Sequence, residues 1–295
     1  MVSCFLDGPQ GRLHYLDYST QEVTADLSKV FNFEEAVPDQ PALIFLPGLT
    51  NHAHYWDEIA PFFLENYAVY ALDWRGHGDS AAATSYGFAD YAADLARLVN
   101  YLAPTRYFLV GHSFGGYVAL FYASQLKETA GLAGIVACDV KTSSTEEEHL
   151  AGRKAGAKPQ PFFHNRAEVA ARLRATMPDS SVSEERLLEL AQEGVFEEGQ
   201  AVRLKYDRQV LDFEPVDPYS FAAQVTVPTL VINGANSEIM NTKQARELVK
   251  TLPQAKRVEI PEAGHFVYLD RPADFAEAVK SFLGKQASSK SRNKS

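Results

Sequence analysis

The segment at residues 111–116, Gly-His-Ser-Phe-Gly-Gly, follows directly on an apolar run and leads into a helix-like stretch. This layout of strand, sharp turn and helix constrains the fold, because a strand and a helix that meet so closely leave no room for Cβ atoms beside the turn. A serine at such an elbow, here Ser113, sits on a strained turn with its hydroxyl exposed above the sheet. The amide of Phe114, at the positive end of the predicted helix, would point to where an oxyanion forms. We interpret Ser113 as a candidate nucleophile; the alternative is a glycine-rich turn with an idle serine.

Short apolar runs rich in β-formers alternate along the chain with segments of helical length. This alternation is typical of a mostly parallel sheet with helices on both faces. It predicts strands at residues 42–46, 67–72, 106–110, 132–138, 229–232 and 257–260. It predicts helices at residues 55–63, 88–103, 117–126, 242–252 and 273–283. A small antiparallel pair is expected before them, at residues 4–6 and 12–16.

One interval, residues 141–221, breaks this alternation. It contains no convincing buried strand, and helical patterns dominate at residues 166–177 and 183–192. An interval of this length is too long for an ordinary connection between strands, so we predict a helical cap inserted into the core. The predicted division is a core at residues 1–140 and 222–284, a cap at residues 141–221 and a disordered tail at residues 285–295.

Composition and charge argue against several classes of protein. The formal net charge is −10, and the basic residues cluster only in the tail, so neither nucleic acid nor an anionic membrane is expected as a partner. The two cysteines, Cys4 and Cys138, are too few for a disulfide framework, and no Cys/His cluster has metal-ligand spacing. Neither a membrane span nor a secretory signal is predicted. We therefore expect a cytoplasmic protein with a small-molecule substrate and no cofactor or metal.

Two further turns and a loop follow predicted strands. The turn at residues 47–51, Pro-Gly-Leu-Thr-Asn, can present the amide of Leu49 as a second oxyanion donor. The alternative is an ordinary turn in a connecting loop. The loop at residues 73–80 carries Asp, Arg and His, which we expect to hold the loop by hydrogen bonds.

His265, in a turn after the last predicted strand, is the best candidate general base, because a histidine there can reach over Ser113. A packed, satisfied histidine is the alternative.

Together these motifs resemble the α/β-hydrolase family. The resemblance rests on Pro-Gly-Leu at residues 47–49, Asp-Trp-Arg-Gly-His-Gly-Asp-Ser at 73–80, the elbow at 111–116 and Gly-His at 264–265. It covers about residues 40–140 and 225–283 and implies an α/β-hydrolase fold with the chain order nucleophile, acid, base.

The chain departs from this family at the usual position of the acid. The family commonly has Gly-x-x-Asp after the seventh strand, whereas here Gly-Ala-Asn-Ser places Ser237 in that position. A neutral hydroxyl cannot stabilise an imidazolium as a carboxylate does. Two acids remain as candidates: Asp139, at the end of a predicted strand on the same edge as Ser113, and Glu238, one residue beyond the vacant position. The resemblance favours Asp139, because one branch of small esterases keeps its acid there and uses the serine to support it.

These assignments predict a serine hydrolase that cleaves a small or medium carboxylic ester. Ser113 would form an acyl-enzyme, with His265 as base, Asp139 as acid and the amides of Leu49 and Phe114 as the oxyanion hole. Two alternatives stay open. The same triad could cleave an amide, a thioester or a carbon–carbon bond, or the chain could be a ligand-binding receptor on this fold.

The predicted cap offers side chains for a substrate pocket. Possible apolar wall residues are Phe162, Phe163, Leu173 and Met177. Possible partners of a substrate carboxylate are Arg153, Lys154, Arg172 and Arg174. Each set also has an ordinary structural explanation. The apolar residues can form the cap's own core, and the basic residues can form its solvated face.

Overall fold

The computed structural model describes residues 1–20, 40–126 and 131–289, and its centre is an eight-stranded sheet. In spatial order the strands are β1 (Val2–Leu6), β2 (Leu13–Asp17), β4 (Ala68–Leu72), β3 (Ala42–Leu46), β5 (Tyr107–His112), β6 (Leu132–Cys138), β9 (Thr229–Gly234) and β10 (Ala255–Ile260). From β4 to β10 all neighbours run parallel, whereas β1 pairs with β2 and β2 with β4 in antiparallel register. The mostly parallel sheet and its antiparallel start are confirmed.

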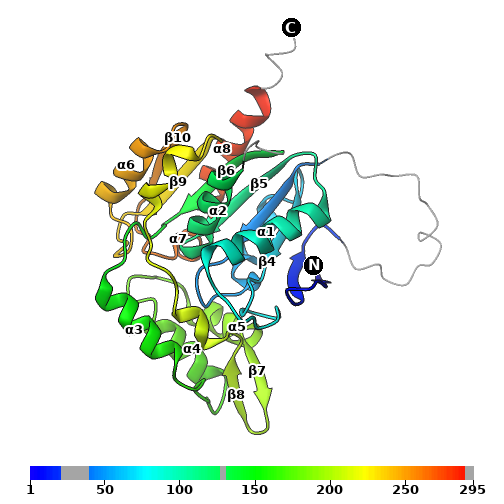
Figure 1. Cartoon of the computed structure of the whole chain (residues 1–295), viewed down its shortest axis with the longest axis vertical. Coiled ribbons are helices and arrows are strands. Elements are labelled where there is room, and N and C mark those ends of the chain that lie inside the picture. Colours follow the sequence, from blue (N-terminus) through cyan, green and yellow to red (C-terminus); the bar gives the residue numbers. More distant parts are fainter. Residues whose placement is uncertain (21–39, 127–130, 290–295) are drawn as a thin grey trace, which may run out of the picture.

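Helices cover both faces of the sheet (Figure 1). The core helices are α1 (Phe88–Leu102), α2 (Phe114–Gln125), α6 (Thr242–Thr251), α7 (Val267–Asp270) and α8 (Pro272–Ser289). Helices α1, α2 and α6 pack on one face with Ile44 and Leu109, and α7 and α8 pack on the other with Phe45 and Val110. Because successive residues of a strand point to opposite faces, a strand covered on both faces must be apolar throughout, as β3 is.

Two short 3-10 helices replace the α-helix predicted at residues 55–63. They are η2 (Ala53–Trp56) and η3 (Ala60–Phe62). Pro61 explains the difference, because proline lacks the amide donor and its ring clashes with the preceding turn of an α-helix.

The cap at residues 141–221 lies between β6 and β9 in the chain and beyond one end of the sheet in space (Figure 1). Its elements are α3 (Glu146–Gly156), α4 (Arg166–Ala175), α5 (Glu184–Glu193), β7 (Val195–Glu198), β8 (Ala201–Leu204), η4 (Arg208–Leu211) and η5 (Pro218–Ser220), and η6 (Ala222–Gln224) follows it. The β7–β8 hairpin is absent from the sequence expectation. Its strands are short and largely exposed, so they lack a buried apolar run, and Gly199 at the turn has φ +64°.

The cap packs directly on the core. Cap residues Val169, Leu187 and Leu190 belong to the same buried apolar cluster as Phe45 and Trp56 of the core. The division into core and cap domains stays a prediction, because one apolar cluster spans both.

The C-terminal helix is longer than the sequence predicts. Helix α8 continues to Ser289, so the tail expected to be disordered from residue 285 begins as helix. The rest of that tail, residues 290–295, lies outside the described residues. Among the helices of the described part, none combines the length and the apolar character that crossing a bilayer needs.

Candidate active site

Ser113 lies at the junction of β5 and α2, as the strand–turn–helix pattern predicts. Its backbone has φ 51° and ψ −116°, in a region that a residue with a Cβ rarely adopts. The amide of Ser113 donates a hydrogen bond to the carbonyl oxygen of Cys138 at 2.8 Å, which ties the elbow to β6. The neighbouring strands therefore hold the serine in its strained conformation.

The glycines around the elbow are required by close backbone contacts. A Cβ at Gly111 would lie 2.4 Å from the amide nitrogen of Gly116, within the same turn. A Cβ at Gly115 would lie 2.3 Å from the carbonyl oxygen of Leu46 at the end of β3. Helix α2 thus begins in direct contact with the ends of β5 and β3, which brings the elbow beside the turn that follows β3.

His265 and Asp139 form a hydrogen-bonded pair. The His265 Nδ1 to Asp139 Oδ1 distance is 2.7 Å. Asp139 is fully buried at the end of β6 with φ 48°, and its carboxylate also accepts hydrogen bonds from Ser237 Oγ at 2.6 Å and from the amide of Gly234 at 3.0 Å. Glu238 is exposed, and its backbone amide points to Asp179. The structure therefore places Asp139, and not Glu238, against the imidazole.

Opposing effects act on the protonation of Asp139. Burial raises the pKa of its carboxyl above the ordinary value, and the hydrogen bond and charge of His265 act to lower it, followed by the hydrogen bonds from Ser237 and Gly234. The groups that lower the pKa are those that hold the carboxylate in place. Burial and the neighbouring charge of His265 lower the pKa of His112 well below its usual range, so His112 is neutral.

The His265 loop is fixed beside the elbow from two sides. On the core side, His112 Nε2 donates to the carbonyl oxygen of His265 at 3.0 Å, and the two rings are 4.5 Å apart. On the cap side, Asp179 Oδ2 accepts a hydrogen bond from the amide of His265 at 2.8 Å. Sequence reasoning missed Asp179, because it lies in an irregular segment with no motif around it. Ser113 Oγ makes no hydrogen bond to any described residue.

The turn after β3 has its expected place next to the elbow. The amide of Asn51 donates to the carbonyl oxygen of Gly48 at 3.2 Å, and Thr50 has φ 65°, which makes a tight turn around Leu49. Trp74 Nε1 donates to the carbonyl oxygen of Pro47 at 2.9 Å and anchors the turn. Within the described chain, the amides of Leu49 and Phe114 donate to no other group, so both remain free for a ligand oxygen.

The polar residues of the loop after β4 support its backbone, as the sequence predicts. Arg75 forms two hydrogen bonds with the buried carboxylate of Asp94, at 2.6 and 2.9 Å. His77 Nδ1 donates to the carbonyl oxygen of Arg75 at 2.9 Å. These contacts occupy the side chains in holding the loop.

Among the described residues, His14, Asp73 and Asp79 form one group of possible metal ligands. Their ligand atoms lie within 4.8 Å of one another. His14 Nδ1 is hydrogen-bonded directly to Asp73 Oδ2 at 2.6 Å, and Asp79 is ion-paired with Lys205 at 2.8 Å. The three groups therefore direct their ligand atoms to partners within the protein and do not fit an open metal site.

The cap closes over the turn after β3. A small enclosed cavity of about 10 Å³ is lined by Thr50, His52, Tyr55, Val169, Leu173, Leu190, Gly194, Leu204, Lys205 and Tyr206. Of the four predicted apolar wall residues only Leu173 lines it, whereas Phe162 is 60% exposed and Met177 is buried in the shared apolar cluster.

The four cap cations do not line this cavity. Arg174 pairs with Glu184 and donates to the carbonyl oxygens of Ser180 and Val182, so it holds the cap together. Arg153 pairs with Asp212 on the surface, and Lys154 and Arg172 are exposed. Their predicted role toward a substrate carboxylate has no support in this arrangement.

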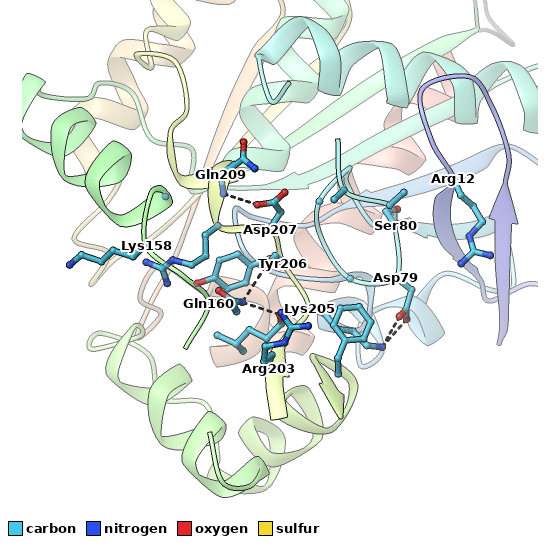
Figure 2. A pocket seen from close by; sticks show the side chains of 18 of the residues that line it. Arg12, Asp79, Ser80, Lys158, Gln160, Arg203, Lys205, Tyr206, Asp207 and Gln209 are labelled. Carbon is cyan, nitrogen blue, oxygen red and sulfur yellow. Dashed lines mark hydrogen bonds and ion pairs between the residues drawn. The ribbon is translucent and has the colours of Figure 1, made fainter. Parts of the chain in front are cut away.

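A much larger groove, of about 700 Å³, shares Leu204, Lys205 and Tyr206 with the small cavity, and Figure 2 shows side chains that line this groove. The N-terminal strands, the loop after β4 and the cap hairpin line it, and it includes none of Ser113, Asp139 and His265. Figure 2 shows Asp79, from the loop after β4, joined to Lys205 of the cap across this groove.

Comparisons with known proteins agree with this architecture. The sequence profile of the alpha/beta hydrolase fold matches residues 41–272. The chain is 28% identical over 285 residues to mouse sn-1-specific diacylglycerol lipase ABHD11, covering 90% of this chain and 89% of the relative. It is 28% identical over 268 residues to 2-succinyl-6-hydroxy-2,4-cyclohexadiene-1-carboxylate synthase of Serratia proteamaculans, covering 87% and 97%. The solved structure of E-2-(acetamidomethylene)succinate hydrolase superposes with a TM-score of 0.80 at 21% identity, covering 96% and 99%.

Proposed function

This chain belongs to the alpha/beta hydrolase family, and from that premise we propose that it hydrolyses small or medium carboxylic esters through an acyl-enzyme on Ser113. The observation that carries the proposal is the 2.7 Å pair of His265 and Asp139 beside a serine on a strained elbow. A buried carboxylate that accepts from Nδ1 fixes the imidazole in the tautomer whose Nε2 can take a proton.

The proposed reaction has two halves. In the first, Ser113 Oγ attacks the acyl carbon, its proton passes to His265 Nε2, and the leaving alcohol takes that proton as the ester bond breaks. In the second, His265 activates a water that hydrolyses the acyl-enzyme. The free amides of Leu49 and Phe114 stabilise the oxyanion in both halves, and Asp139 stabilises the charged imidazole.

Hydrolysis of a thioester or cleavage of a carbon–carbon bond by the same residues is a second candidate. The name of one relative supports it: at the same 28% identity as the lipase, a second relative is named a synthase, so related chains differ in the reaction for which they are named. The nucleophile, the base, the acid and the two amides would have the same roles for each bond type, so an assay has to identify the bond. A cytoplasmic location likewise stays a prediction.

Turnover of nitrophenyl esters of increasing acyl length, by the wild type and by Ser113→Ala, tests the proposal. We expect turnover by the wild type that is lost in the variant, and the dependence on acyl length shows which acyl size the site accepts. Turnover that survives Ser113→Ala would rule out Ser113 as the nucleophile. Absence of turnover by the wild type, with thioesters cleaved instead, would select the second candidate.

A further inference from the structure

A second serine–histidine–aspartate series of hydrogen bonds lies away from the elbow. Ser3 Oγ on β1 is 2.8 Å from His14 Nε2 on β2, and His14 Nδ1 is 2.6 Å from Asp73 Oδ2 just after β4. Strands β1, β2 and β4 are neighbours at one edge of the sheet, separated from β5 and its elbow by β3 (Figure 1). This series is therefore spatially distinct from Ser113, His265 and Asp139.

The proton arrangement in this series follows from the state of Asp73. Burial acts to raise the pKa of this carboxyl, but the hydrogen bond and charge of His14, the charge of His52 and the amide of Asp79 together outweigh burial and leave the pKa below its ordinary value. Asp73 is therefore a carboxylate that accepts from His14 Nδ1–H. In the neutral imidazole, Nε2 is then free to accept the proton of the Ser3 hydroxyl, as in a serine that is activated by a histidine.

The histidine and the aspartate are held rigidly. Asp73 Oδ1 accepts from the amide of Ala53 at 2.6 Å, and Oδ2 also accepts from the amide of Asp79 at 2.9 Å. The amide of His14 donates to Ser80 Oγ at 2.8 Å. Both side chains are only 1% exposed, whereas Ser3 is exposed on the edge strand. The only member of the series that a reagent can reach is thus the hydroxyl.

We propose that Ser3 is a second reactive serine, which takes up a small acyl or phosphonyl group from an activated donor with His14 as the base. With a fluorophosphonate, Ser3 Oγ bonds to phosphorus, the phosphorus–fluorine bond breaks and fluoride leaves. The hydroxyl proton passes to His14 Nε2, and the imidazolium that forms stays paired with the carboxylate of Asp73. We expect one group per serine, without turnover. This inference is independent of the ester hydrolysis proposed above.

Labelling of the full chain in the Ser113→Ala background tests the proposal. The protein is treated with a small fluorophosphonate, and the tryptic peptide of residues 1–12 is followed by mass spectrometry. Ser220 is the internal reference, because it is also exposed but its hydroxyl donates to the backbone carbonyl oxygen of Asp217. We expect Ser3 to react about 100-fold faster than Ser220, the usual contribution of a positioned base.

A matched variant shows whether the labelling of Ser3 depends on His14 or only on the exposure of its hydroxyl. Ser3→Ala combined with Cys4→Ser and Ser113→Ala moves the hydroxyl by one residue, to the opposite face of β1 and away from His14. We expect the label in residues 1–12 to fall to the rate of Ser220. Equal labelling of the serine introduced at position 4, or a Ser3 rate no higher than that of Ser220, would overturn the proposal. Circular dichroism confirms that each variant is folded.

Discussion

At the scale of single residues, the candidate site depends on how Asp139 is held. Its carboxylate accepts three hydrogen bonds in a fully buried position, from His265, Ser237 and Gly234. Ser237 occupies the position where the family usually has the acid, and its hydroxyl supports the acid supplied by the neighbouring strand. In this chain the acid thus comes from the end of β6, and the hydroxyl that supports it comes from the turn after β9.

The first prediction concerns the identity of the acid. We expect Asp139→Asn to lower kcat for a nitrophenyl ester by about 10³- to 10⁴-fold, because an amide no longer fixes the imidazole tautomer or stabilises its charge. Glu238→Gln is the matched control, since Glu238 is exposed and one residue from Ser237, and should change kcat by less than about twofold. Steady-state kinetics on both variants decides. A large loss in Glu238→Gln with little change in Asp139→Asn would move the acid to the other strand end.

At the scale of elements, the elbow depends on the contact between helix α2 and strand β3. Both Leu46 and Pro47 place their carbonyl oxygens where a Cβ of Gly115 would lie, at 2.3 and 2.6 Å. These atoms are backbone, so they cannot move aside as a flexible side chain can. The same contact sets the distance between the turn that carries Leu49 and the start of α2.

The second prediction follows from that contact. We expect Gly115→Ala to lower the free energy of unfolding by about 3 kcal/mol or more, because the added methyl group overlaps the end of β3. Gly284→Ala in helix α8 is the control, because a Cβ there meets nothing within 4 Å, and alanine should stabilise the helix by up to about 1 kcal/mol. Urea denaturation of both variants measures the difference. Equal stability of Gly115→Ala and the wild type would contradict the packing described here.

Elements of the fold differ in how strongly local sequence determines them. Buried parallel strands and the elbow could be predicted, because continuous apolar runs and closely spaced glycines follow from local geometry. The β7–β8 hairpin could not, because its exposed strands carry no buried pattern, and the effect of Pro61 on the helix after β3 was overlooked. Asp179 was missed for a different reason: its contact with the amide of His265 joins cap and core across the fold, and no local pattern records it.

At the scale of the whole molecule, buried histidines link stability to pH. Burial lowers the pKa of His52 and of His77 from 6.5 to about 4. Between these values the unfolded chain binds protons on both residues and the folded chain does not, so stability falls as pH drops from 6.5 toward 4. The raised pKa values of Asp139 and of His54 act in the opposite direction.

The third prediction is that the melting temperature falls between pH 6.5 and pH 4.5. His77→Gln should make this dependence shallower, because it removes one of the buried histidines, with His52 and His112, that bind protons more readily on unfolding. His164→Gln should change it much less, since the His164 side chain is 89% exposed and its partner Glu168 lies at the surface. Thermal unfolding followed by circular dichroism at several pH values is the measurement. A melting temperature that rises toward pH 4.5 would show that other groups dominate the linkage.

The fourth prediction concerns the contact between the cap and the loop after β4, whose release would give the cap more freedom to admit longer acyl chains. The segment after β8 is joined to the loop after β4 by the ion pair of Lys205 with Asp79 and by a 2.7 Å hydrogen bond from the amide of Gly78 to the carbonyl oxygen of Lys205. We expect Lys205→Gln to cost no more than about 1 kcal/mol of stability, as partly exposed ion pairs do. It should also raise kcat/KM for longer acyl chains several-fold relative to acetyl.

Arg203→Gln is the matched control, because Arg203 pairs with Glu198 inside the same hairpin. Assays of both variants across acyl lengths would decide, and an unchanged preference in Lys205→Gln would show that substrate enters without release of this contact.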